Sequence, residues 1–373
     1  MRIAINALAS RGTLSGAARY IRSLVTSLAK VDAKNEYVLY VSQDDVPLFA
    51  RLGPNFQPVP TVAIRPLRLL WEQTELPWDL KRRRVDVFHG PTFIAPLVKT
   101  CRQVVTIHDM TFFLLPQCHL FTKRHYFQRL IPRCVGRANQ VIAVSESTKR
   151  DIVRILGSQC SKKIKVIYHG KDERFRPDRA GAASCGLRTK YGLLGRVILF
   201  VGLIEPRKNL ERLIRAYAKL KSLHQDSCLV LAGSQGWGYE AVLRAVSESG
   251  VKDRVFFPGF IPDRELPSLY NLADVFVYPS LYEGFGLPVL EAMSCGTPVV
   301  ASRVSSMPEI AGDAALLVDP HDVDSIAQAL ERVLVDRTLR ERMAEGGIRR
   351  SQPFTWERTA RETLAAYEEA AGK

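Results

Sequence analysis

The sequence lacks the features that mark three broad classes of protein. No apolar run approaches the roughly 20 residues that a membrane-spanning helix needs. The seven cysteines stand at scattered spacings and form neither a disulfide framework nor a C-x-x-C metal site, so a reducing compartment is expected. The chain starts directly with an apolar strand, so we expect no signal peptide and a cytoplasmic location.

Acidic residues are scarce in the first half of the chain. Residues 1–177 hold 29 Lys and Arg against 13 Asp and Glu, a net charge of +16, whereas the remainder holds 24 against 25, a net charge of −1. So one-sided a field favours an anionic partner, namely a membrane surface, a phosphorylated acceptor or nucleic acid. No helix-turn-helix, zinc or single-strand aromatic motif accompanies the charge, so we do not expect nucleic acid. A generally basic soluble surface remains the alternative.

Residues 65–84 concentrate cations beside aromatic and aliphatic side chains. Leu69, Leu70 and Trp71 next to these cations could lie in a lipid interface, which would place the protein peripherally on the inner face of a membrane. A helix that packs on its own domain and leaves a solvated basic face explains the same pattern.

The alternation of apolar strands with helical spacings predicts an α/β protein with two Rossmann-type parallel sheets. We expect an N-terminal domain over residues 1–175, a glycine-bearing linker over 176–195 and a second domain over 196–352. The C-terminal segment 353–373 is expected to contain a last helix over 356–371, with Thr355 as its N-cap.

The chain is organised around residues 275–302. An apolar strand, a glycine-bearing turn, a short helix with Pro288 at its first position and a second strand form one βαβ unit. Ligands of parallel sheets bind at the carboxyl ends of the strands, where helix N-termini hold anions. Glu283 in the turn and Glu291 in about the first turn of the helix flank this N-terminus.

A pair of cations occupies the corresponding place earlier in the second domain. The strand at 197–201 is followed by Gly202 and then by Arg207 and Lys208, directly before a predicted helix. Cations are unfavourable at a helix N-terminus unless an anion binds there, so the pair predicts an anion site. A second glycine-bearing loop, with Gly12 and Gly16, follows the first strand of the chain.

Glu283 and Glu291 form an E-x7-E motif, set among Glu-Gly-Phe-Gly-Leu-Pro and Gly-Thr-Pro-Val-Val. This pattern resembles family 4 of the retaining glycosyltransferases, which includes sucrose synthase, glycogen synthase and many bacterial mannosyl- and glucosyltransferases. The resemblance is strong over residues 197–302, fair over 101–177 and weak over 40–100. It implies the GT-B fold, in which two Rossmann-type domains face each other across a cleft. It further implies that the C-terminal helix of segment 353–373 crosses back to the N-terminal domain.

The resemblance also implies roles for particular residues. Glu283 would bind hydroxyl groups of the donor sugar, Glu291 would bind the ribose, and Arg207 and Lys208 would neutralise the diphosphate. His108, just past a strand end in the first domain, would meet the sugar, and with Arg207, Lys208 and Glu283 it forms the expected catalytic set. The other expected nucleotide-sugar contacts are Gly16, Gly202, Ser234, Phe260, Ile261, Phe285, Gly286 and Leu287.

The expected activity is metal-independent transfer of a hexose, with retention, to a glycan or polyprenyl-linked acceptor in surface polysaccharide synthesis. The stretches 108–116 and 233–239 are most similar to members that use GDP-mannose, and a UDP-sugar is the alternative donor. No metal ion is expected, because no acidic D-x-D cluster stands at a strand end beside the cleft, whereas Arg207 and Lys208 supply positive charge. Apart from the nucleotide-sugar substrate, no cofactor is expected. A glycosidase built on the two glutamates, and a sugar-nucleotide epimerase of the same architecture, are the competing interpretations.

Overall fold

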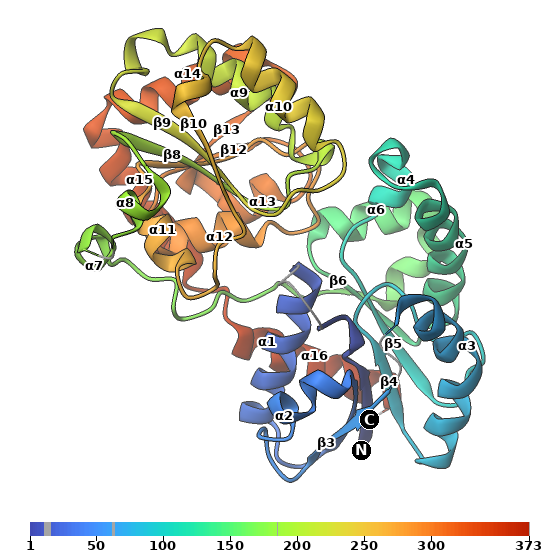
Figure 1. Ribbon diagram of the computed structural model, residues 1–373. Helices are drawn as coiled ribbons and strands as arrows, with labels where there is room; N and C mark the ends of the chain where they lie inside the picture. The colour runs from blue at the N-terminus through green and yellow to red at the C-terminus, as the bar shows by residue number, and fades with distance from the viewer. Residues whose placement is uncertain (11–15, 62–63, 185, 373) are drawn as a thin grey trace. The chain divides into compact units, whose positions relative to one another are not determined.

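The computed structural model describes residues 1–10, 16–61, 64–184 and 186–372. The chain divides into two compact units, which we call unit 1 (Met1–Gly170 and Phe354–Lys373) and unit 2 (Lys171–Pro353). Figure 1 shows both units, with the two ends of the chain in unit 1. Among the described residues, no helix is long and apolar enough to cross a membrane.

Unit 1 contains a parallel seven-stranded sheet in the order β3-β2-β1-β4-β5-β6-β7. Its strands are β1 (Arg2–Asn6), β2 (Glu36–Val41), β3 (Phe56–Pro60), β4 (Val87–Gly90), β5 (Arg102–Ile107), β6 (Gln140–Ala143) and β7 (Ile164–Val166). The central strands are buried on both faces, which explains their continuous apolar sequences. The strand order reverses direction between β1 and β4, and crevices for ligands form at such points.

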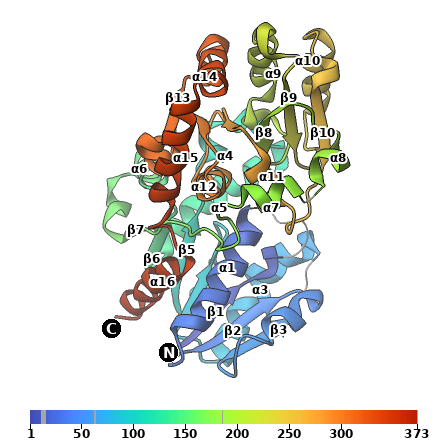
Figure 2. The same ribbon diagram turned by 90° about the vertical axis from the view of Figure 1, so that its left-hand side faces the viewer.

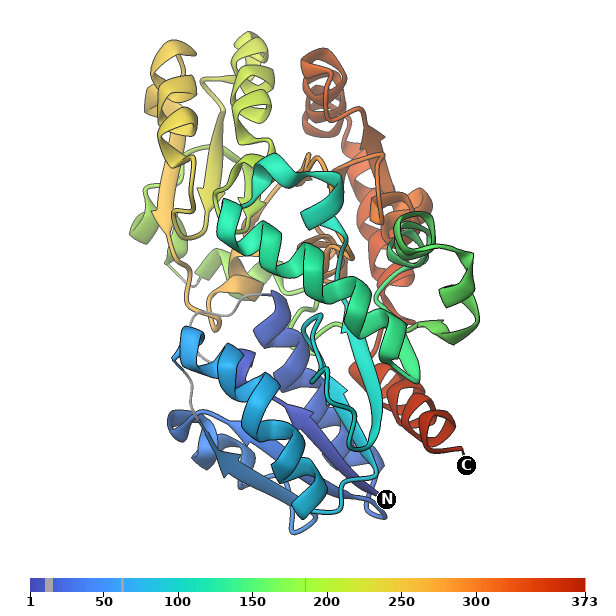
Figure 3. The ribbon, with the colours of Figure 1, turned by 90° about the vertical axis from the view of Figure 1, so that its right-hand side faces the viewer.

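Helices cover both faces of this sheet. They are α1 (Gly16–Val31), α2 (Val46–Phe49), α3 (Arg65–Arg82), α4 (Thr111–Leu114), α5 (Phe121–Arg137), α6 (Glu146–Leu156) and α16 (Trp356–Ala371). Helices α3 and α5 lie on one face, in front of the strands in Figure 3. Helix α16 packs against α1 and against strands β4, β5 and β6, as Figure 2 shows for α1.

A buried polar cluster joins α16 to the sheet. His89 on β4 hydrogen-bonds through Nδ1 to the hydroxyl of Tyr367 at 2.7 Å and through Nε2 to Oγ1 of Thr106 at 2.8 Å. The hydroxyl of Tyr20 on α1 lies 3.1 Å from the same Thr106 oxygen. Burial, with the nearby His108, lowers the pKa of His89 to about 3, so this imidazole is neutral. The last helix is therefore an integral part of unit 1.

Close approach of the backbone fixes the start of α16. A Cβ atom at Gly170 would lie 2.0 Å from the backbone nitrogen of Trp356, so only glycine fits there. The ring of Trp356 stacks on His169 with their centroids 5.6 Å apart. Thr355 caps the helix by accepting a hydrogen bond from the backbone N–H of Arg358, as predicted.

Unit 2 contains a parallel six-stranded sheet in the order β10-β9-β8-β11-β12-β13. Its strands are β8 (Arg196–Val201), β9 (Ser227–Ala232), β10 (Val255–Gly259), β11 (Val275–Tyr278), β12 (Val299–Ser302) and β13 (Ala315–Val318). Its helices are α7 (Arg179–Ser184), α8 (Leu187–Tyr191), α9 (Leu210–Lys219), α10 (Tyr239–Glu248), α11 (Leu266–Leu272), α12 (Leu287–Ser294), α13 (Met307–Ala311), α14 (Val323–Val335) and α15 (Arg337–Ser351). The direction of strand order reverses between β8 and β11.

Two parallel-sheet units confirm the predicted fold class, and several details differ from the sequence-based expectation. The segment 176–195, expected as a linker, contains helices α7 and α8, and α7 packs against α11. Helix α12 begins at Leu287, so Pro288 is its second residue instead of its first. Trp71 is buried against Tyr40, so it belongs to the core and is not free to enter a lipid interface.

Candidate functional site

The loops that follow β8 and β11 bring four charged side chains together in unit 2. Glu205, Arg207 and Lys208 come from the loop after β8, and Glu283 comes from the loop after β11. These two strands are neighbours in the sheet and mark the point where the strand order reverses direction. The charged cluster therefore occupies the position where open parallel sheets bind their ligands.

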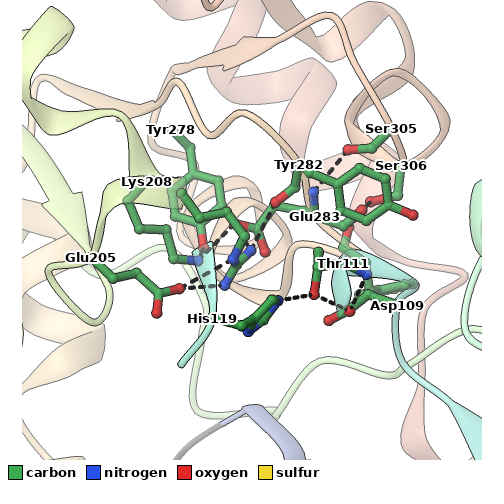
Figure 4. A network of polar contacts seen from close by, with 12 residues as sticks. Asp109, Thr111, His119, Glu205, Lys208, Tyr278, Tyr282, Glu283, Ser305 and Ser306 are labelled. Carbon is green, nitrogen blue, oxygen red and sulfur yellow. Dashed lines mark hydrogen bonds and ion pairs between the residues drawn. The ribbon is translucent and has the colours of Figure 1, made fainter. Parts of the chain in front are cut away.

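Lys208 is buried and donates hydrogen bonds to two side chains, Tyr278 on β11 and Glu283 in the loop that follows it. Its Nζ donates to the hydroxyl of Tyr278 at 2.6 Å and to Oε1 of Glu283 at 2.7 Å. Figure 4 shows the three side chains turned toward one another. Burial, and then the charge of Arg207, lowers the pKa of Lys208, whereas Glu283 opposes this shift.

Arg207 is held at both ends of its guanidinium. Nη1 lies 2.8 Å from the backbone oxygen of Tyr282 and 2.8 Å from Oε1 of Glu283. Nε and Nη2 both donate to Oε1 of Glu205, at 3.1 and 2.7 Å. These contacts fix the plane of the guanidinium and leave little rotational freedom to the side chain.

Glu283 is ionised at neutral pH in spite of its burial. Burial alone would raise its pKa, but Arg207 and Lys208 together outweigh this effect and lower the pKa to about 2. With two cations and two carboxylates, the cluster of Glu205, Arg207, Lys208 and Glu283 carries no net charge.

Hydroxyl groups from the loop after β12 hold the loop that carries Glu283. Oγ of Ser305 accepts from the backbone N–H of Glu283 at 2.9 Å, and Oγ of Ser306 donates to the carbonyl oxygens of Glu283 and Phe285, both at 3.0 Å. Gly286, the N-cap of α12, has a φ of +99°, which favours glycine. These contacts fix the second half of the loop, from Glu283 to the start of α12.

Glu291 is the fifth residue of α12, one residue further along the helix than predicted. Its side chain is buried, and its Oε2 accepts a hydrogen bond from the hydroxyl of Tyr270 at 2.9 Å. Glu283 and Glu291 therefore sit in different surroundings, the first among cations and the second beside a tyrosine. The predicted binding of the donor's ribose by Glu291 stays a prediction.

The other predicted donor contacts of unit 2 lie at the carboxyl ends of adjacent strands. Gly202 follows β8, Ser234 follows β9, and Phe260 and Ile261 follow β10. A Cβ atom at Gly233 would lie 1.9 Å from the backbone oxygen of Gly202. The loop after β8 and the loop after β9 therefore touch through their backbones. Phe260 is exposed and Ile261 is buried.

The remaining predicted residues of unit 2, Phe285 and Leu287, flank Gly286 at the start of α12. Both side chains are buried, so they fix the helix start in the core of unit 2. Any contribution of these residues to a ligand would then come from their backbone N–H groups, as the sequence predicts.

Two predicted residues belong to unit 1. His108 follows β5, and its Nε2 lies 2.8 Å from the carbonyl oxygen of Pro91, which can only accept. Nε2 therefore carries the proton and Nδ1 is an acceptor, and burial lowers the pKa of His108 so that the ring is neutral. A Cβ atom at Gly16 meets no described atom within 4 Å, while Gly12 lies outside the described residues.

A second polar network in unit 1 follows His108 directly. Oδ1 of Asp109 accepts from the backbone N–H of Thr111 at 2.9 Å and from its hydroxyl at 2.5 Å. Nε2 of His119 lies 2.9 Å from the same hydroxyl oxygen (Figure 4). Asp109 therefore closes a turn at the start of α4, which is a structural role.

Sequence reasoning missed four residues of the unit 2 site. Glu205 stands two positions before Arg207, and a carboxylate so close to a predicted anion-binding cation was a usable signal. Tyr278, the last residue of β11, was assigned only to its strand. Ser305 and Ser306 lie more than 20 positions from Glu283, and nothing in their local sequence indicates the contact.

Comparison with known proteins identifies the family. Residues 193–350 match the model described as "Glycosyl transferases group 1", and residues 14–175 match "Glycosyltransferase Family 4". The chain is 34% identical over 292 residues to the O-antigen chain mannosyltransferase B of Escherichia coli, covering 78% of this chain and 76% of that protein. It is 35% identical over 227 residues to the serotype-specific mannosyltransferase WbdA of the same species, covering 60% of this chain and only 28% of WbdA.

Solved structures support the same fold. A sucrose-phosphate synthase from Thermosynechococcus elongatus superposes with a TM-score of 0.79 at 23% identity, covering 99% of this chain and 98% of that one. Anabaena Alr3699/HepE in complex with UDP-glucose superposes with a TM-score of 0.77 at 21% identity, covering 98% of this chain and 100% of that one. Taken with the identity to mannosyltransferase B, these matches show that the chain belongs to the group 1 glycosyltransferases and is a glycosyltransferase with two parallel-sheet units of GT-B type.

Proposed function

We propose that this glycosyltransferase moves mannose from GDP-mannose to a glycan or lipid-linked acceptor in surface polysaccharide synthesis, with retention of configuration. The observation that carries the proposal is the buried cluster of Arg207, Lys208 and Glu283 at the strand-order reversal of unit 2. Two cations fixed at the carboxyl ends of parallel strands suit the diphosphate of a nucleotide-sugar.

Charge stabilisation of the leaving group is the chemistry that these residues would supply. As the bond between sugar and diphosphate breaks, negative charge builds on the phosphate oxygens, and fixed cations lower the energy of that state. Arg207 and Lys208 need little reorganisation for this task, because Glu283, Tyr278 and Tyr282 already hold them. Oε1 of Glu283 binds both cations. The carboxylate of Glu283 would also orient hydroxyl groups of the donor sugar.

Retention would follow if the acceptor attacks the face from which the diphosphate departs. The state of Glu283 fits this mechanism better than it fits a glycosidase. A glycosidase needs a carboxylic acid with a raised pKa as proton donor, whereas the pKa of Glu283 is lowered to about 2. Glu283 is therefore unsuited to the proton-donating role that one of the two carboxyl groups of a glycosidase must have.

The donor assignment rests on the relatives. Two relatives at 34% and 35% identity are named mannosyltransferases, which supports mannose as the transferred sugar. A structural neighbour was solved with UDP-glucose, so a UDP-sugar is the second candidate. We propose metal-independent transfer because Arg207 and Lys208 bring positive charge to the diphosphate without a cation from solution.

We further propose that one face of unit 1 rests on the inner, anionic surface of a membrane that carries the acceptor. Helix α5 holds five Lys and Arg and no acidic residue, and Arg129, Arg133 and Arg137 form a solvent-facing row along it. On α3 the solvent-facing side chains include Leu70 and Trp78. Cations beside exposed apolar side chains suit an anionic lipid interface.

The loop between β4 and β5 joins these two helices into one surface. Gln73 of α3 donates to the backbone oxygen of Ala95 at 3.4 Å and accepts from the N–H of Leu97 at 3.0 Å. Arg137 of α5 donates to the backbone oxygen of Leu97 at 2.9 Å. Helices α3 and α5 therefore present their outer sides from the same face of the sheet (Figure 3).

The test is a donor panel on the intact protein. Thermal unfolding with GDP, UDP or ADP, each with and without EDTA, should show the largest stabilisation with GDP and no effect of EDTA. Transfer from GDP-mannose should give a product with the anomeric configuration of the donor, as read by NMR. Absence of stabilisation by every nucleotide would refute the donor site, and loss of activity in EDTA would refute metal independence.

A further inference from the structure

We propose that Glu205 is an exchangeable counter-ion of the donor site. In the free protein its carboxylate occupies the edge of Arg207 that the donor diphosphate would use, and the diphosphate displaces it on binding. This inference deepens the proposed function and rests on its placement of the diphosphate at Arg207 and Lys208.

The geometry of the guanidinium carries the first step. Nε and Nη2 of Arg207 both donate to one oxygen of Glu205. These two groups form an edge of the guanidinium that can pair in a two-pronged manner with a carboxylate or a phosphate. Nη1 instead faces the backbone oxygen of Tyr282 and the carboxylate of Glu283. A phosphate that takes the two-pronged edge must therefore compete with Glu205.

The two carboxylates of the cluster differ in how firmly they are held. Oε1 of Glu283 pairs with both Arg207 and Lys208, and its side chain is 10% exposed. Within the part of the chain that the structure describes, Glu205 forms an ion pair with Arg207 only. Its side chain is 18% exposed, and it directly precedes the 3-10 turn Pro206–Lys208. Displacing Glu205 breaks one ion pair, whereas displacing Glu283 breaks two, one of them with the buried Lys208.

The charge of the cluster explains why such a counter-ion is useful. Without a ligand, Glu205 and Glu283 balance the partly buried Arg207 and the buried Lys208, so both cations have a partner. When Glu205 withdraws, the remaining three groups carry +1 and face the phosphates. When the nucleoside diphosphate must leave, the returning carboxylate competes with it and favours release.

The test compares E205Q with the wild type for binding of GDP, UDP and GMP by calorimetry. Glutamine keeps the size of the side chain but removes the competing charge, so the diphosphate that binds the wild type should bind E205Q about five- to tenfold more tightly. GMP, which lacks the second phosphate, should gain little. In steady-state assays KM for the donor should fall, and kcat should fall as well if product release limits the rate.

Two further variants control the comparison. E211Q removes a nearby carboxylate on α9 and should bind diphosphates like the wild type. E205D keeps the charge but shortens the side chain, so it should fold normally and show a smaller gain in the same direction.

Contrary results separate this inference from the proposed function. No binding of any nucleoside diphosphate to the wild type would refute the donor site itself. Normal wild-type binding with unchanged or weaker binding to E205Q would refute only the exchange, and would make Glu205 a residue that positions Arg207. An equal gain with GMP would also refute displacement by the diphosphate.

Discussion

Units 1 and 2 share an architecture and differ in where their charge lies. Unit 1 holds 29 Lys and Arg against 15 Asp and Glu, a net charge of +14, whereas unit 2 holds 24 against 23, a net charge of +1. The excess cations of unit 1 include the exposed row on α5, while unit 2 buries Lys208 and Glu283 beside its strand ends. One sheet type therefore supports both a long-range field and a preorganised local site.

The polar groups at the strand ends show the same contrast. In unit 1, His89 and His108 are neutral, because burial lowers their pKa values. In unit 2, opposite charges keep Glu283 ionised. The neutral histidines of unit 1 form fixed hydrogen bonds, whereas the ionised cluster of unit 2 can respond to an incoming anion.

The largest effect is expected from breaking the cluster of unit 2. E283Q leaves Arg207 and Lys208 without their shared carboxylate, which should cost about 3 to 5 kcal/mol of stability. Transfer activity should fall by roughly a thousandfold, because the cations lose their orientation. Urea unfolding and initial rates measure the two effects. E331Q, on the exposed side of α14, is the control and should change neither; equal behaviour of both variants would contradict a special role for Glu283.

Measuring the free energy of unfolding over a range of pH tests whether charge holds Glu283 in the cluster. The pKa of Glu283 is about 2, against an ordinary value of 4.5, so its ion pairs stabilise the fold above pH 4.5 and lose this effect as the pH falls toward 2. The shift corresponds to up to about 3 kcal/mol. The stability difference between wild type and E283Q should therefore narrow through this window. A difference that stays constant down to pH 2 would show that Glu283 is not held by charge.

The contribution of the positive charge of unit 1 to membrane binding can be tested by removing arginines from α5. R129Q/R133Q/R137Q should weaken binding to vesicles that contain phosphatidylglycerol by about a hundredfold, because each cation near an anionic surface contributes about 1 kcal/mol. Stability and transfer to a water-soluble acceptor should not change. Vesicle co-sedimentation and salt titration measure the effect.

The matched control for the vesicle experiment lies in unit 2. R332Q/R342Q/R349Q removes three exposed helix arginines there and should bind the vesicles like the wild type. Equal loss in both triple variants would mean that net charge, and not the α5 surface, determines binding.

The smallest effect is expected from a change in the buried polar cluster that joins α16 to the sheet of unit 1. Y367F removes the hydroxyl that lies 2.7 Å from Nδ1 of His89, which should cost about 1 to 2 kcal/mol of stability. Binding of nucleoside diphosphates should be unchanged, because Tyr367 belongs to unit 1 and the proposed diphosphate site to unit 2. Chemical unfolding and calorimetry check the two statements, and altered nucleotide affinity would argue against this separation.

The fold could be predicted further than the site. Strands buried on both faces, such as Val275–Tyr278, are continuous apolar runs, and the cap of α16 shows as Thr355 before an amphipathic stretch. Arg207 and Lys208 could be predicted as an anion site because cations are unfavourable at a helix N-terminus unless an anion binds there. Helices α7 and α8 were missed because they are short and their sequence is rich in glycine.

The details of the cluster depend on loop conformations that local sequence does not encode. The pairing of Glu205 with Arg207 requires the turn Pro206–Lys208 and the positive φ of Asn209. The serines that hold Glu283 come from the loop between β12 and α13. Sequence patterns report burial and periodicity, and neither of these fixes which side chains meet across two loops.

The placement of α16 has a consequence for synthesis of the chain. Strands β4 to β6 leave the ribosome more than 200 residues before the helix that covers them, and the whole of unit 2 is made in between. Unit 2 can thus complete its core while the sheet of unit 1 still exposes an apolar face. During this interval the nascent protein is open to chaperone binding and aggregation, and the interval closes only when Trp356 to Ala371 has emerged.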